Sequence, residues 1–109
     1  MSLYFRNGKT SIKSATSTTT HVLTLWDSVY IAYPGQTVTL PEPSTCIGHT
    51  YTIKLGATHT GSADTVIINV ASGGTIEGNA THNINTNWGY HKFIAGNNSA
   101  GSATWMIIV

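Results

Sequence analysis

Apolar and polar residues alternate along most of this chain from His21 onward. Tyr51, Ile53 and Leu55, for example, are separated by single polar residues, and a period of two is typical of a strand with one buried face. Turn residues separate these segments, and no window of eleven residues has a helical period. We therefore expect strands over residues 22–26, 29–33, 37–40, 50–55, 65–70, 75–78, 88–94 and 104–109. Eight or nine short strands predict an all-β fold, an antiparallel β-sandwich or jelly roll.

The apolar segments also predict the core. Trp26 and Trp105 lie inside apolar runs, and we expect both rings to be buried. The last segment, Ser102–Val109, carries no polar tail, so it must be covered along its whole length. We therefore assign Trp105, Ile107 and Val109 to the core or to contacts between subunits.

The first twenty residues differ from the rest. Residues 14–20 are almost entirely Ser and Thr, which offer no apolar face to bury. Arg6, Lys9 and Lys13 make this segment mildly basic. We interpret residues 1–20 as an N-terminal arm or collar and residues 21–109 as the head domain.

The chain carries very little charge. Only 8% of its 109 residues are charged and the net charge is +1, whereas about a quarter of residues are charged in an average soluble domain. The absence of a basic stripe argues against a nucleic-acid partner, and the absence of an apolar run of about eighteen residues argues against membrane insertion. Exposed strands with so little charge need protection from their neighbours, and burial in a defined oligomer would provide it.

Five short motifs, in order, resemble a recurrent C-terminal domain of viral fibre proteins, found in phage tail fibres and in surface proteins of large DNA viruses and their satellites. The family pattern is strand-Leu-Pro, Tyr-Thr-Ile-Lys, an apolar strand, a Thr-Ile-Asp-Gly turn and a final Trp-x-Ile-Ile. The matching segments here are Thr37–Pro41, Thr50–Lys54, Val66–Ile68, Gly74–Gly78 and Thr104–Ile108. The likeness covers roughly residues 21–109.

This resemblance implies a homotrimeric β-sandwich head on a fibrous stalk at the virion surface. Its exposed loops would bind a host-surface receptor, often a glycan, and its N-terminal arm would join the rest of the fibre or virion. Two segments depart from the family pattern. The loop before Trp105 is longer and carries Asn97 and Asn98, and residues 79–92 are rich in His, Asn and aromatic residues.

Catalytic chemistry is poorly represented. The chain has four carboxylates, whereas glycoside hydrolysis needs two of them roughly 5 to 10 Å apart across a cleft. Glu77 follows Ile76 in a turn, where its side chain would hydrogen-bond turn amides. Cys46, the single cysteine, is interpreted as a small buried residue, and with His49 it lacks a third orienting group. We expect no enzymatic activity and no cofactor.

Metal binding is also not expected within one chain. No two of the five histidines share a strand face at positions i and i+2. A three-fold axis would change this, because one histidine from each subunit could meet two others. His82 and His91 are then the first candidates.

A binding role has better support in the segment Asn87–His91. Asn87, Trp88, Tyr90 and His91 place two aromatic rings and two polar side chains beside a glycine. Sugar sites combine aromatic faces with groups that hydrogen-bond hydroxyls. These four residues, with Asn97 and Asn98, are the candidate receptor site. Alternatively, Trp88 and Tyr90 fill the core or the trimer interface.

Two hypotheses therefore remain open. In the first, the chain is a trimeric head that binds a host receptor. In the second, it is a structural connector or minor capsid decoration whose functional end is the basic arm. A free-standing monomeric lectin ranks last, because it would leave apolar edges exposed.

Overall fold

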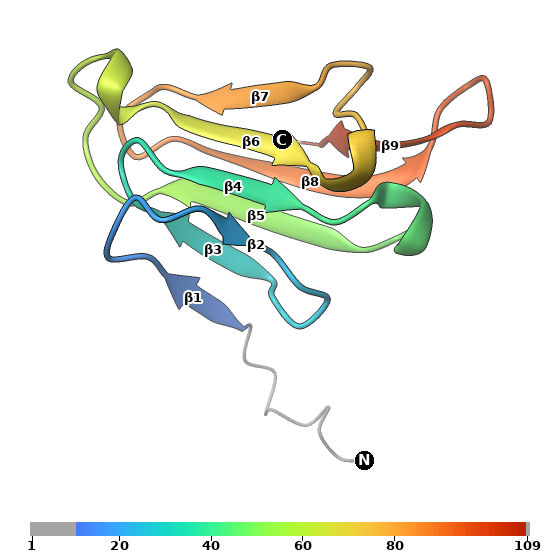
Figure 1. Cartoon of the computed structure of the whole chain (residues 1–109), viewed down its shortest axis with the longest axis horizontal. Coiled ribbons are helices and arrows are strands. Elements are labelled where there is room, and N and C mark those ends of the chain that lie inside the picture. The colour runs from blue at the N-terminus through green and yellow to red at the C-terminus, as the bar shows by residue number, and fades with distance from the viewer. Residues whose placement is uncertain (1–10, 109) are drawn as a thin grey trace, which may run out of the picture.

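The structure is a computed structural model and describes residues 11–108. These residues are mostly β, in two mixed sheets with three short 3-10 turns, as the sequence predicts for an all-β fold. The five-stranded sheet has the order β1 (Ile12–Ser14), β3 (Val29–Ala32), β5 (Thr50–Leu55), β8 (Tyr90–Asn97), β9 (Ala103–Ile107). The four-stranded sheet has the order β2 (His21–Val22), β4 (Thr37–Leu40), β6 (Val66–Val70), β7 (Thr81–Ile84) (Figure 1). The 3-10 turns are η2 (Pro43–Thr45), η3 (Ser62–Asp64) and η4 (Ala71–Gly73).

The expectation of antiparallel sheets is wrong for two of the four strand pairs in the five-stranded sheet and for two of the three in the four-stranded sheet. The first six strands alternate between the two sheets, and β1, β3 and β5 pair in parallel, as do β2, β4 and β6. The antiparallel pairs are β5 with β8, β6 with β7, and β8 with β9. A chain that crosses to the other sheet after every strand returns in its original direction, so its strands pair in parallel. Residues 12–70 therefore form a stack of three coils.

The first two coils repeat with the same spacing in both sheets. The register pairs Ile12 with Val29 and His21 with Val38, each pair being 17 residues apart. The sequence repeats at this spacing, because Ser, a β-branched residue, Ala, Thr and Leu recur at equivalent positions. The equivalent pairs are Ser11 and Ser28, Ile12 and Val29, Ala15 and Ala32, Thr20 and Thr37, and Leu23 and Leu40.

Buried side chains from both sheets form a single hydrophobic cluster. Trp105 is fully buried, and its indole nitrogen donates a 2.8 Å hydrogen bond to the carbonyl oxygen of Pro41. That bond satisfies the polar atom of the largest core side chain. Ile107 is partly buried against the same cluster, and Val109 lies outside the described residues.

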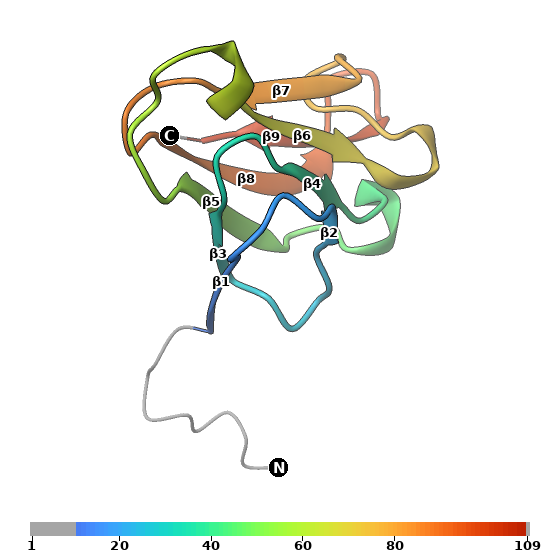
Figure 2. The same ribbon diagram turned by 60° about the vertical axis from the view of Figure 1, so that its left-hand side comes forward.

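The two edges of the five-stranded sheet differ: the β9 edge is covered, and β1 has no second neighbouring strand within residues 11–108. At the β9 edge, the amide of Trp105 donates to Thr75 and the amide of Glu77 donates to Trp105. The Glu77 carboxylate also accepts a 2.9 Å hydrogen bond from the amide of Ile107. Glu77 therefore binds a neighbouring strand. At the opposite edge, β1 and β2 are the terminal strands of their sheets at the same end of the molecule (Figures 1 and 2).

The expectation that Trp26 is buried is wrong, since 81% of this residue is exposed. The apolar run that contains it is cut by a turn. The Asp27 carboxylate accepts hydrogen bonds from the amide and hydroxyl of Thr24, and the amide of Asp27 donates to the carbonyl of Thr24. This turn ends the strand early and directs Leu25 and Trp26 to the surface.

The predicted arm lies partly outside the described residues. Its described part contributes β1, which pairs with β3, and the connection from β1 to β2. The division into an arm and a head stays a prediction.

Candidate functional site

The turn that enters β8 holds Trp88 at the surface. Trp88 is 52% exposed and has a backbone φ of 51°, a left-handed conformation that is unusual for a bulky residue. Its amide donates a 3.0 Å hydrogen bond to Ala57, and its carbonyl accepts one from the ammonium of Lys54. The next residue must be small, since a Cβ on Gly89 would lie 2.2 Å from the Thr86 hydroxyl oxygen. Hydrogen bonds at Trp88 and close packing at Gly89 therefore hold this turn in place while the indole is exposed.

Two further side chains of the predicted site lie beside Trp88. Tyr90 is 48% exposed and pairs with Lys54 across β5 and β8, with the ammonium nitrogen 5.6 Å from the ring centroid. The Asn87 side chain accepts a 2.7 Å hydrogen bond from the amide of His59. Because Trp88 and Tyr90 are exposed, the alternative that they fill the core of this chain does not hold. The sequence did not predict that Lys54 and His59 lie at this site. Lys54 reaches it through the pairing register of β5 and β8, and His59 through its hydrogen bond to Asn87.

The remaining predicted residues lie elsewhere. Asn97 ends β8, seven residues after Tyr90, so a strand length of about 23 Å separates it from the aromatic pair. Asn98 stabilises its own loop, where its side-chain Oδ1 atom accepts hydrogen bonds from the amides of Ala100 and Ser102. The structure therefore divides the six predicted residues between the two ends of β8.

His91 faces His82 rather than the aromatic pair. The two rings, from β8 and β7, meet edge to face at 4.7 Å, and both contact Phe93. Burial and the neighbouring His91 lower the pKa of His82, while Glu77 opposes them. Among residues 11–108, no three His, Cys, Asp or Glu side chains gather in a way that could hold a metal ion.

Cys46 is buried and carries a free thiol. Burial raises its pKa, which keeps the thiol protonated and poorly nucleophilic. Its Sγ atom lies 3.6 Å from the carbonyl oxygen of Glu42. The structural interpretation made from the sequence agrees with this environment.

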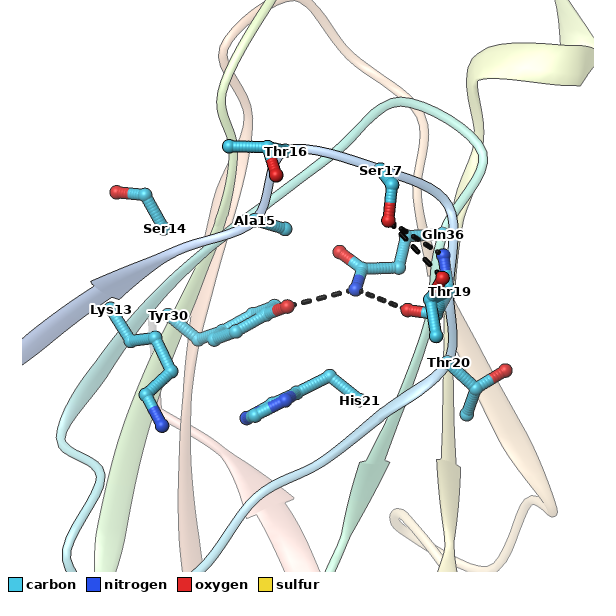
Figure 3. A pocket seen from close by; sticks show the side chains of 10 residues that line it. All are labelled: Lys13, Ser14, Ala15, Thr16, Ser17, Thr19, Thr20, His21, Tyr30 and Gln36. Carbon is cyan, nitrogen blue, oxygen red and sulfur yellow. Dashed lines mark hydrogen bonds between the residues drawn. The ribbon is translucent and has the colours of Figure 1, made fainter.

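A polar pocket that sequence reasoning missed opens at the β1 and β2 end (Figure 3). Its volume is about 250 Å³, and residues 14–20 arch over it. Gln36, only 1% exposed, donates to the hydroxyl oxygen of Tyr30 at 2.8 Å and to the carbonyl of Thr19 at 2.7 Å. The Tyr30 ring stacks on His21 with centroids 4.4 Å apart.

A buried carboxylate lies beside the pocket. Asp27, 4% exposed, lies 3.7 Å from both the ammonium of Lys13 and the Nε2 atom of His21. Ordinary strand and turn segments separate these residues in the sequence, so no motif predicted that they would lie together. The 17-residue repeat could have found them, because it aligns Lys13 with Tyr30 and His21 with Val38.

Within residues 11–108, no helix has the length and apolar character to span a membrane. No protein-family model matches this sequence, and no curated protein matches it.

Proposed function

We propose that this chain is the receptor-binding head of a viral fibre. In this proposal it forms a homotrimeric β-sandwich at the virion surface and attaches to a host-surface receptor, with a glycan as the favoured class. The ordered motifs that resemble fibre-tip domains support the fold and the setting. The exposed aromatic pair Trp88 and Tyr90 supports the binding role and is the observation that carries the proposal.

The backbone conformation of Trp88 gives further support to a binding role for the exposed pair. A left-handed conformation at a residue other than glycine costs roughly 1 to 3 kcal/mol and persists where surrounding bonds impose it. Here the bonds from Lys54 and to Ala57 hold the turn while half of the indole stays in solvent. Strain retained to present an apolar ring outward suits a binding surface.

The side chains around the ring fit a sugar. Trp88 and Tyr90 offer apolar faces, the Lys54 ammonium lies 5.6 Å from the Tyr90 ring centroid, and Asn87 precedes Trp88 in the chain. A pyranose presents apolar C–H faces to aromatic rings and hydroxyls to polar groups, so this mixture matches its chemistry. Net affinity would rest mainly on the aromatic pair.

The trimer is part of the same proposal. Several large apolar side chains are exposed on a single chain that has little charge to keep copies apart. Four of them belong to the first coil and the turn after it: Ile12, Val22, Leu25 and Trp26. Contact between subunits would remove such surfaces from water.

The exposed apolar residues of the first coil also favour the second candidate function, a structural connector or capsid decoration. In that case the β1 and β2 end would be the functional end, and Trp88 would have no ligand. Trp26 and Trp88 thus belong to opposing hypotheses, and they lie at opposite ends of the strands.

The test is a matched pair of variants, Trp88→Ala and Trp26→Ala, each assayed for binding to host cells and to a glycan array. We expect Trp88→Ala to lose at least tenfold in binding while it keeps the wild-type oligomeric state, because an exposed ring contributes to binding and little to folding. Trp26→Ala should keep receptor binding. The reverse pattern, in which Trp88→Ala is silent and Trp26→Ala abolishes association with the virion or stalk, would favour the connector.

A further inference from the structure

We propose that the pocket at the β1 and β2 end binds a single carboxylate-bearing sugar ring, of the hexuronate class. This site is separate from the Trp88 surface and does not depend on the fibre-head proposal. It is formed by Lys13, His21, Tyr30 and Gln36 beneath the hydroxyl-rich connection of residues 14–20 (Figure 3).

The inner face of the stack becomes polar at this end. In the five-stranded sheet, successive coils place Ile53, Tyr30 and Lys13 at one aligned position. In the four-stranded sheet, the aligned residues are Ile68, Val38 and His21. The apolar core thus gives way to a hollow lined by polar side chains in the first coil.

Two hydrogen-bond donors of this hollow lack a close acceptor among the described residues. The Tyr30 hydroxyl already accepts a bond from Gln36, and its own proton has no acceptor among the described residues. Burial raises the pKa of Tyr30, so this proton is retained at neutral pH. The Lys13 ammonium has three protons and faces only Asp27, at 3.7 Å. A ligand that supplies acceptors would satisfy both groups.

Two side-chain acceptors near these donors already hold hydrogen bonds. The Asp27 carboxylate accepts from the amide and the hydroxyl of Thr24, and the Gln36 carbonyl oxygen accepts a 3.0 Å bond from the amide of Tyr33. The buried Nε2 atom of His21 lies 3.7 Å from the Asp27 carboxylate and has no hydrogen-bond partner within residues 11–108. The donors of Lys13 and Tyr30 therefore favour a ligand that carries hydrogen-bond acceptors.

The charge and volume of the pocket narrow the class of ligand. Asp27 offsets part of the Lys13 charge, so the pocket suits a monoanionic carboxylate better than a phosphate dianion. About 250 Å³ lies just below the roughly 300 to 1,000 Å³ of ordinary ligand pockets, which leaves room for one sugar ring. The Ser and Thr hydroxyls of residues 14–20 both donate and accept, which matches the hydroxyls of such a ring.

The experiment titrates the isotope-labelled full chain with sodium D-glucuronate and follows chemical shifts by NMR. Parallel titrations use D-glucose, which lacks the carboxylate, and sodium acetate, which lacks the ring. We expect glucuronate to perturb residues 13–21, Tyr30 and Gln36 with a dissociation constant in the millimolar range. Glucose and acetate should bind at least tenfold more weakly, because each loses one set of contacts.

Two variants test the residues. Lys13→Gln and Tyr30→Phe should each weaken glucuronate binding about tenfold, since each removes a donor to the ligand. Lys92→Gln, a change at an exposed lysine of β8, should bind like the wild type, as should Trp88→Ala. Lys13 is largely exposed, so its variant should fold even if Tyr30→Phe does not.

Three results would each overturn the proposal: no shift in the pocket at a large excess of glucuronate, equal binding of glucose or acetate, or unchanged affinity in folded Lys13→Gln. The two proposals can fail separately. If the wild type does not bind glucuronate but Trp88→Ala loses receptor binding, the hexuronate site is refuted and the fibre-head proposal stands.

Discussion

At the scale of single residues, the three tryptophans differ in backbone conformation and burial although they have the same side chain. Trp26 and Trp88 are both exposed tryptophans, but only Trp88 lies in a left-handed backbone conformation. Trp105, which like Trp26 adjoins apolar residues in the sequence, is fully buried. The turn that Thr24 and Asp27 form keeps Trp26 out of the core. Side-chain chemistry alone could not have predicted which ring is presented.

The strain at Trp88 leads to an unusual order of stability. Trp88→Gly should be about 1 kcal/mol more stable than Trp88→Ala, because glycine adopts a positive φ without the steric cost of a Cβ. Chemical denaturation of the two variants measures the difference. In β6 the order should reverse, with Ile67→Ala more stable than Ile67→Gly, and an equal order at both sites would contradict the strain.

His82 should make stability depend on pH. Its pKa is lowered in the folded protein by burial and by His91, so the folded state binds its proton less readily than the unfolded state. The stabilising contribution is therefore complete above the ordinary histidine pKa of about 6.5 and is lost as pH falls below it. Melting temperatures of the wild type should fall between pH 7.5 and pH 5, and His82→Gln should fall less.

A matched variant at another histidine checks this assignment. His59→Gln changes a side chain that hydrogen-bonds the Thr65 hydroxyl in a loop. This variant keeps His82, so its melting temperature should still fall on acidification. If His82→Gln and the wild type lose the same stability on acidification, the buried histidine is not responsible.

At the scale of elements, alternation predicted most strand positions but not their partners. Period-two patterning says that one face is buried, and it is the same for parallel and antiparallel pairing. The information on pairing lies in the 17-residue repeat, which spans only two coils and five matched positions. Lys13 and His21 belong to this repeat, so the pocket that they line was hidden by the same short length.

The two terminal strands of the five-stranded sheet should differ in protection. Both β1 and β9 end the sheet, but β9 is bonded on its outer side by residues 75–77, whereas β1 has one described neighbour. Amide hydrogen exchange should therefore be fast in β1 and slow in β9. Equal exchange would mean that β1 is covered in solution.

The covering contact itself can be removed. Glu77→Leu takes away the acceptor for the Ile107 amide and should cost roughly 1 kcal/mol of unfolding free energy. Glu77→Gln keeps an acceptor and should cost less. Urea denaturation measures both variants, and equal losses would show that the side-chain oxygen contributes nothing to this edge.

At the scale of the whole molecule, the all-β class followed from the sequence, and the oligomeric state is the central prediction. A low-charge chain with exposed apolar residues on its first coil should associate, and the fibre-head proposal specifies three copies. Light scattering coupled to size-exclusion chromatography should give the mass of three chains at micromolar concentration. A monomer under these conditions would count against both the trimer and the receptor-binding head.

The unequal edges of the five-stranded sheet also limit how copies can polymerise. β1 could accept a strand from another copy, but β9 is occupied by residues 75–77 and cannot pass the pairing on. Two copies joined through β1 would therefore leave no free end on this sheet for a third. The contacts of Glu77 and its neighbours therefore block one edge of this sheet against strand pairing with another copy.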